Sequence, residues 1–362
     1  MRPRVRRGTG RSKHSRAVIV MAGMLLLTLT VPAPAQAGGE AAGTTAAGFL
    51  SVGTGAGVLG RGGATLGLAG DLAIVPWNAA ALGWLDGTQI ALAHATLADQ
   101  TQQEWAAVGG RFARSALRWS IEGLYQSEGS FEGRTAENKP TPTPNFDVSS
   151  VALGFHLAHP LGPLATVGVG GKYVGENLGS VSGTGYTMDA GLQVRAGILG
   201  AGVAATNLPG GMSYGGTRYD LPMNVGLGAA LDLPGTGLRL ALDANFPRAY
   251  YRDVRVGAEW CWHDLLALRA GYRRELDAPK ELNEDGPSFG LGAGARGMWV
   301  DYGYLIPGAG EGQHRLAVNL RPGRFAGIAA GPFGLKSMPR SFDEKTPTGV
   351  PATPRKDLAK QK

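Results

Sequence analysis

Charged residues in the central part of this chain alternate with apolar residues in short stretches. In one stretch Arg239 and Asp243 fall on one side of the pattern, and Leu240 and Leu242 fall on the other. Side chains of a β-strand alternate between two faces, so this period of two predicts a strand with one charged face and one apolar face. Charged groups taken out of water need partners of opposite sign. The pattern therefore predicts ion pairs in an enclosed space.

The same charged, inward face is predicted for a larger set of residues on other strands. Its members are Arg118, Glu122, Arg255, Glu259, Arg269, Asp301 and Arg315, with Asp189, Arg195, Arg273 and Arg296 assigned by the same alternation. Mixed signs around a closed space favour a network that holds an inner segment. The alternative is a wet, open pore.

Catalytic and metal-binding patterns are weak in this chain. None of the six histidines has a second His, Cys or carboxylate at metal-ligand spacing. Ser120 and His156 could approach each other across a sheet, but no third group is placed to orient them, and G-x-S-x-G is absent. We therefore expect no catalytic residues, no metal and no cofactor.

Gly55, Gly57 and Gly60 match the G-x-G-x-x-G pattern of dinucleotide-binding loops. The match lacks a following βαβ unit, and in a chain with 59 glycines among 362 residues it carries little weight. We interpret the glycines as compact, irregular backbone packed in a confined space.

The charge of the chain is concentrated at its two ends. The formal net charge is +7, but residues 1–37 hold seven basic and no acidic residues, and residues 321–362 hold nine basic and three acidic. The 19 basic and 25 acidic residues between them have a net charge of −6. This distribution argues against a nucleic-acid-binding surface. A single cysteine excludes an intramolecular disulfide.

The first 37 residues are typical of a secretory signal peptide. A basic stretch precedes an apolar run over residues 17–31, and Ala35-Gln36-Ala37 is a small-x-small cleavage pattern. The alternative is a transmembrane anchor, but the run is shorter than the roughly 20 residues that a spanning helix needs. An exported protein is predicted, and the strands that follow favour the outer membrane.

Strand-like alternation continues to residue 320. Fourteen segments are predicted, at 88–97, 103–112, 116–126, 147–158, 164–174, 185–195, 198–207, 222–232, 237–246, 252–262, 264–274, 287–296, 298–305 and 312–320. Connections at 128–145, 208–221 and 275–287 are long, whereas those at 114–115, 233–236 and 263 are short. Outer-membrane barrels separate long outer loops from short periplasmic turns in this way, and soluble sandwiches do not. An all-β, transmembrane antiparallel barrel of about 14 strands is therefore predicted.

The organisation follows from these segments: signal peptide 1–37, glycine-rich segment 38–87, barrel 88–320, and a basic, proline-rich periplasmic tail at 321–362 that we expect to be disordered. We expect the glycine-rich segment to plug the lumen, with Arg61 and Asp71 paired to wall charges and with Trp77 and Asn78 as further polar or amphipathic groups. The alternative is a flexible periplasmic leader.

Several ordered motifs resemble the PorV/PorQ family, a relative of the FadL-type channels. They are Gly53-Thr54-Gly55, the run from Leu59 to Ala64, Ala69-Gly70-Asp71, Trp77-Asn78, Val256 to Trp260, Leu266 to Tyr272, Phe289 to Gly292, Asp301 to Tyr304, and His314-Arg315-Leu316. The resemblance implies a FadL-like barrel with an N-terminal lumen segment.

The resemblance also implies a function. PorV/PorQ proteins suggest an accessory of protein secretion (type IX-like) or of surface assembly, with secretion components as partners. The wider FadL relationship suggests a channel for uptake of a hydrophobic ligand, and a general porin is a further alternative. Outer-membrane lipid is the surrounding partner in each case, and no nucleic acid is expected.

Overall fold

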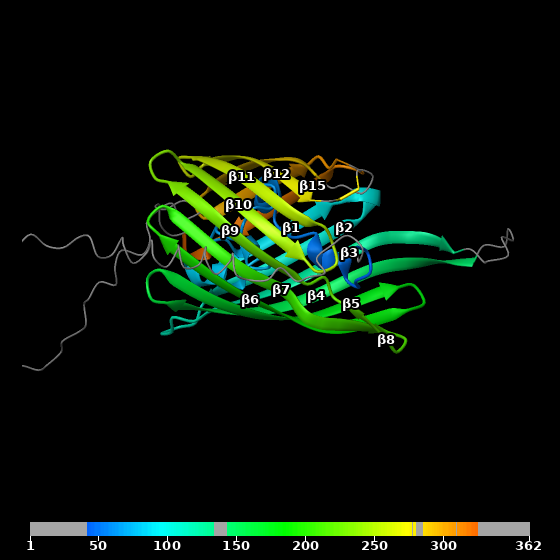
Figure 1. Ribbon diagram of the computed structural model, residues 1–362. Helices are drawn as coiled ribbons and strands as arrows, with labels where there is room; N and C mark the ends of the chain where they lie inside the picture. Colours follow the sequence, from blue (N-terminus) through cyan, green and yellow to red (C-terminus); the bar gives the residue numbers. More distant parts are fainter. Residues whose placement is uncertain (1–41, 134–142, 277, 280–284, 309, 325–362) are drawn as a thin grey trace, which may run out of the picture.

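The computed structural model describes residues 42–133, 143–276, 278–279, 285–308 and 310–324 (Figure 1). The predicted signal peptide lies outside these residues. So does the predicted tail beyond Arg324.

The chain forms a closed antiparallel β-barrel, as predicted. Fourteen strands follow one another around it, with each strand hydrogen-bonded to the next. They are β1 (Gln89–Thr96), β2 (Gln102–Arg111), β3 (Arg118–Gly133), β4 (Thr143–Leu161), β5 (Ala165–Leu178), β6 (Ser182–Ala196), β7 (Leu199–Tyr214), β9 (Asn224–Leu233), β10 (Leu238–Pro247), β11 (Arg252–Trp262), β12 (Leu266–Leu276), β13 (Gly286–Ala295), β14 (Met298–Leu305) and β15 (Gln313–Leu320). Strands β1 and β15 close the barrel, with Ala93 opposite Ala317. A short additional strand, β8 (Thr217–Asp220), pairs with the far end of β7.

Tight turns join the strands at one end of the barrel, which we call the short-turn end. Between β11 and β12, His263 and Asp264 have φ values of 49° and 56°. Two consecutive residues with positive φ fit the right-handed twist of a hairpin. Arg296 (φ 51°) and Gly297 occupy the turn between β13 and β14. The prediction that Arg296 faces the lumen is wrong: its side chain is exposed, because a turn residue leaves the strand alternation.

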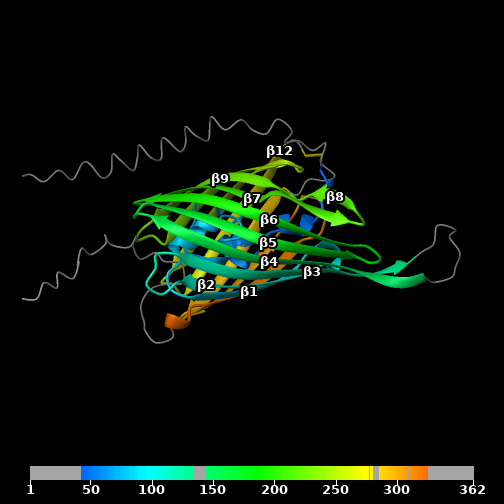
Figure 2. The same ribbon diagram turned by 90° about the horizontal axis from the view of Figure 1, so that it is seen from below.

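At the opposite, long-connection end, some strands are longer than the sequence predicted. The predicted connection at 128–145 is partly strand, since β3 reaches Gly133 and β4 begins at Thr143. These two strands project beyond the others (Figures 1 and 2). Likewise, most of the connection at 208–221 belongs to the end of β7 and to β8. Periodicity misses such extensions, because a hairpin that stands in water on both sides needs no apolar face.

Burial alternates along the strands as the sequence predicted. On β10, Leu240 and Leu242 are 39% and 50% exposed, whereas Ala241 and Asp243 are 7% and 1% exposed. Trp262 lies on the outer, exposed face near the short-turn end. An outward apolar face with aromatic residues near its edge is the face that a transmembrane barrel turns to lipid.

The hydrophobic core lies inside the barrel and is built by the segment that precedes β1. This segment contains η2 (Gly48–Ser51), α2 (Ala56–Gly60), η3 (Leu72–Ile74) and η4 (Ala79–Trp84). Its side chains, among them Leu68, Leu72 and Leu82, pack with wall alanines such as Ala107 and Ala230. Two further 3₁₀ turns, η5 (Ala98–Gln100) and η7 (Pro322–Arg324), lie at the ends of strands.

The inner segment threads the barrel from end to end (Figure 2). At the long-connection end, the Ala46 N–H donates to the Asp220 carbonyl oxygen over 3.0 Å. At the short-turn end, Arg118 Nε donates to the carbonyl oxygen of Leu85 over 3.1 Å. We call residues 46–85 the plug. Among the described residues, no helix combines the length and apolar character needed to cross a bilayer.

The outward face of β10 gives a test of the membrane register. Replacement of Leu242 by Arg places a charge against hydrocarbon and is expected to cost about 2–4 kcal/mol if the site lies near the midplane. The measurement is the unfolding free energy of the folded barrel in bilayers. Leu242→Phe, which keeps an apolar surface, is the matched control. Equal stability of the two variants would reject the assigned face.

Candidate functional site: the plugged lumen and its cavity

The plug backbone runs directly against the inner wall. A Cβ atom on Gly257 would lie 2.4 Å from the carbonyl oxygen of Arg61, and one on Gly271 would lie 2.2 Å from the carbonyl carbon of the same residue. Only glycine permits this approach. The excess of glycine in the sequence therefore has a structural reason on the wall as well as in the plug.

Polar side chains of the wall hydrogen-bond to the plug backbone. The Asp243 carboxylate accepts from the N–H groups of Thr65 and Leu66 over 2.6 and 2.9 Å. Gln193 Nε2 donates to the carbonyl oxygens of Leu66 and Leu68 over 2.8 and 2.6 Å. Each bond satisfies a main-chain group that has no regular secondary structure to pair with.

Glu259 is the centre of a buried ionic cluster. Its carboxylate lies 2.7 Å from Arg61 Nη1 of the plug, 2.6 Å from Arg269 Nε and 3.0 Å from Arg239 Nη1. The side chains of all four residues are less than a tenth exposed. This Glu259 cluster joins the plug to β10, β11 and β12.

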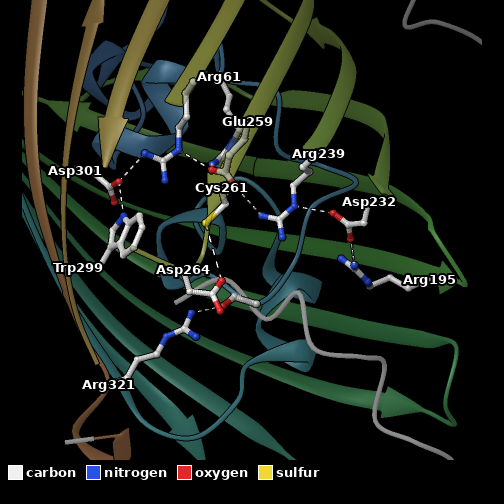
Figure 3. Close-up of polar contacts among 12 residues, drawn as sticks. Arg61, Arg195, Asp232, Arg239, Glu259, Cys261, Asp264, Trp299, Asp301 and Arg321 are labelled. Carbon is white, nitrogen blue, oxygen red and sulfur yellow. Dashed lines mark hydrogen bonds and ion pairs between the residues drawn. The ribbon is translucent and has the colours of Figure 1, made fainter. Parts of the chain in front are cut away.

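The cluster continues along the wall in both directions (Figure 3). On one side Arg239 pairs with Asp232, which also pairs with Arg195 from β6. On the other side Arg269 pairs with Asp301 over 2.6 Å. Asp301 also accepts from the Trp299 indole. The described members carry four positive and three negative charges, so they nearly neutralise one another.

The remaining plug residues singled out by the sequence have local roles. Asp71 and Asn78 cap η3 and η4 by accepting from the backbone N–H groups of Ala73 and Ala80. The expected pairing of Asp71 with a wall charge is not seen among the described residues. The reason is that the start of a short helix leaves N–H groups that a nearby carboxylate satisfies first. Trp77 packs directly against Gly53, where a Cβ would lie 2.1 Å from the indole ring.

Four predicted inward charges outside the Glu259 cluster occupy four different settings. Arg255 pairs with Asp253 over 2.6 Å and lies over the Trp77 ring, 5.0 Å from its centroid. Glu122 accepts from the indole of Trp105 over 2.9 Å. Arg118 is only partly buried, at the short-turn end.

Arg315 is the fourth setting: it is 2% exposed, and its Nε and Nη2 atoms have no hydrogen-bond partner among the described residues. Among the buried charges predicted to face inward, it is the one whose side chain forms neither a hydrogen bond nor an ion pair with a described residue.

A second polar network on β4 to β7 was predicted only in part. Asp189 pairs with Lys172 over 2.8 Å and contacts His156 Nε2 over 3.2 Å. It also accepts from the N–H of Asn207, whose φ of 51° marks a bulge in β7. The alternation indicated Asp189. Lys172 could have been found in the same way, but the Asn207 bulge has no signal in the sequence pattern.

A cavity of about 350 Å³ lies between the plug and the long-connection end. Its floor is apolar and comes largely from the plug, which contributes Leu50, Val52, Val58, Leu59 and Trp77. Its walls carry polar and charged groups of both signs, namely Glu122, Lys172, Asn207, Asn224, Asn245, Asp253, Arg255, Arg273, Gln313 and Arg315. Residues 43 to 54 also line it, so the start of the described chain covers part of this space.

The arrangement is suited to binding an organic molecule. The described residues contain no group of three or more His, Cys, Asp or Glu side chains placed to hold a metal ion. An apolar floor with a few polar groups is typical of small-molecule sites. Below the cavity, the plug closes the direct route to the short-turn end.

Solved structures with a similar fold include two toluene transporters and a FadL homologue. The Pseudomonas putida toluene transporter TodX matches with a TM-score of 0.54 and 14% identity, over 74% of this chain and 96% of that chain. The Ralstonia pickettii toluene transporter TbuX matches with a TM-score of 0.53 and 12% identity, over 74% and 98% of the two chains. A Pseudomonas aeruginosa FadL homologue matches with a TM-score of 0.51 and 11% identity, again over 74% and 98%.

At these identities the likeness concerns the fold alone: the chain is a FadL-like transmembrane β-barrel with a filled lumen. No family model matches the sequence, and no curated protein matches it. The resemblance to PorV/PorQ proteins is therefore not supported by a comparison, whereas the FadL-like architecture is.

The Glu259 cluster gives a test of how the plug is held. Glu259→Gln keeps the shape of the side chain but leaves three arginines without their shared carboxylate. Breaking a buried ion pair in this way costs about 3–5 kcal/mol. We expect faster hydrogen–deuterium exchange in residues 56–72 and an earlier thermal transition of the barrel.

The control is Asp220→Asn, which removes an exposed partner of Arg248 at the long-connection end. Exposed pairs contribute about 0–1 kcal/mol, so this variant should behave as the wild type. Similar exchange in the two variants would mean that the Glu259 cluster does not hold the plug.

Proposed function

We propose that this protein is an outer-membrane channel for hydrophobic small molecules. The observation that carries the proposal is the cavity with an apolar floor, placed in the lumen at the long-connection end and closed below by the plug. A lumen built for ions and sugars needs a continuous aqueous path. Here the described lumen is occupied by packed leucine, isoleucine and alanine side chains.

The apolar outer face of the strands supports an outer-membrane location, and long connections in such barrels face outward. A ligand would then arrive from outside, lose its water against the plug floor and pass inward after the plug rearranges. Two of the structural neighbours are toluene transporters, which supports this class of solute.

The other two functions have less support. The packed plug disfavours a general porin. A secretion accessory of the PorV/PorQ type stays a prediction, because it rests on short motifs whose residues have packing roles here. Among them, Arg61 binds Glu259 and Asn78 caps η4.

Uptake by cells tests the proposal directly. Cells that express the full chain should accumulate radiolabelled toluene faster than cells with an empty vector, because the channel offers a path across the polar outer leaflet. Uptake of a radiolabelled hydrophilic disaccharide is the control and should not change. Faster uptake of the disaccharide without faster uptake of toluene would favour a porin.

Removal of the plug tests its role as a barrier. Deletion of residues 49–82 should raise the single-channel conductance in planar bilayers, because the strands close the barrel without it. Heat-modifiable migration on gels checks that the shortened barrel still folds. A folded, shortened barrel that conducts no better than the full mature chain would contradict the blocking role.

A further inference from the structure

The turn between β2 and β3, at the short-turn end, is strongly basic. Residues 111–118 contain three arginines, Arg111, Arg114 and Arg118, and no acidic residue. Arg111 and Arg118 lie directly opposite each other on the two strands. Like charges in this relation repel and are destabilising. The turn therefore concentrates positive charge in a small space.

We call these three residues the arginine rim, and the protein does not neutralise it. Among the described residues, the guanidinium groups of Arg111 and Arg118 donate to backbone carbonyl oxygens, and none of the three arginines forms an ion pair. Asp86 lies near Arg118 and offsets part of its charge. A net positive charge remains at the turn.

The backbone of the turn is ordered and holds Arg114 at its tip. The Phe112 N–H donates to the carbonyl oxygen of Leu117 over 3.1 Å, and the Ser115 N–H donates to the carbonyl oxygen of Phe112 over 3.2 Å. Arg114 has a φ of 59°, in the left-handed region that glycine or asparagine adopts at lower cost. Its side chain is exposed, so packing does not account for an arginine at this position.

The depth of the turn is given by two aromatic residues on the outer face. Phe112 and Trp119 lie with their ring centroids 6.2 Å apart, and such residues mark the border between hydrocarbon and headgroups. Arg114 is two residues past Phe112, so at about 3.3 Å per residue the tip reaches at most about 7 Å further. The headgroup layer is about 5–8 Å thick on each side of a bilayer. The rim therefore lies within the headgroup layer.

We propose that the arginine rim docks the phosphate groups of anionic phospholipids, such as phosphatidylglycerol, in the leaflet at the short-turn end. Lipid phosphates are present at the depth that the turn reaches, and guanidinium groups bind phosphate oxygens strongly. A soluble acidic protein would match the charge but would have to enter the headgroup layer to reach it. Bound headgroups would offset the repulsion between Arg111 and Arg118. The inference does not depend on which solute crosses the lumen.

The test measures which lipids the barrel retains. The full mature chain is placed in nanodiscs with equal amounts of phosphatidylglycerol and phosphatidylethanolamine that have the same acyl chains. Native mass spectrometry of the released protein then counts the lipids of each kind that stay bound. Wild-type protein should retain phosphatidylglycerol in preference, by roughly fivefold for each arginine that contacts a phosphate.

A double variant, Arg111→Gln with Arg114→Gln, should lose most of this preference. Arg118 is left in place because it also binds the end of the plug. Lysine at the same two positions keeps the charges and should keep most of the preference. The control is Arg218→Gln with Arg248→Gln, which removes two exposed charges at the long-connection end and should change nothing. Heat-modifiable migration confirms that each variant is folded, and the basic residues beyond Arg324 are the same in all of them.

The outcomes distinguish lipid docking from the alternatives. No preference in the wild type, or equal losses in the rim variant and the control, would overturn the inference, since the second result means attraction by net charge alone. If phosphatidylglycerol is not preferred but polyglutamate binds the wild type and not the rim variant, the partner is an acidic protein and the lipid site is rejected. Failure of toluene uptake would reject the hydrocarbon channel without affecting this result, because lipid retention is measured without a solute.

Discussion

The structure depends on one constraint: a main chain without regular hydrogen bonds cannot lie at membrane depth unless the protein satisfies its polar groups. The plug is such a chain, with only short helical turns between residues 46 and 85. Its N–H and carbonyl groups are met by Asp243, Gln193 and Thr166 on the wall. Glycines on the wall let the two backbones approach closely enough for these bonds to form.

The buried charges follow from the same constraint. A buried carboxylate that binds the plug needs positive charges beside it. Glu259 forms ion pairs with arginines from β10, β12 and the plug. Further ion pairs continue this cluster along the barrel wall, from Arg195 at one end to Asp301 at the other (Figure 3). Buried ion pairs by themselves are weak evidence for stability. They do favour one position of the plug over others, because a shift of the plug would leave a buried charge unpaired.

The cavity is what remains of the lumen after the plug is in place. Its apolar floor is the upper side of the plug, and its polar wall belongs to the strands, so the two halves of the site come from separate parts of the chain. Movement of the plug would change the floor, the cavity volume and the access to the far side together. In the proposed channel, binding and passage of a ligand would therefore be coupled through the plug.

The period-two alternation and the uneven connections determined the barrel, the number of its strands and the inward position of charges such as Arg239 and Glu259, because a sheet with one face in lipid must alternate. Glycine content indicated a packed inner segment but not its path.

Only the tertiary structure decided which charges pair, since Arg61 and Glu259 are 198 positions apart and meet through barrel closure. It alone showed that Asp71 caps a helix and that the hairpin of β3 and β4 extends beyond the barrel. It also showed that Arg315 is buried beside the cavity without an ion pair to a described residue. Alternation specifies which side of a strand a residue occupies, but its neighbours across the lumen depend on register, closure and the position of the plug.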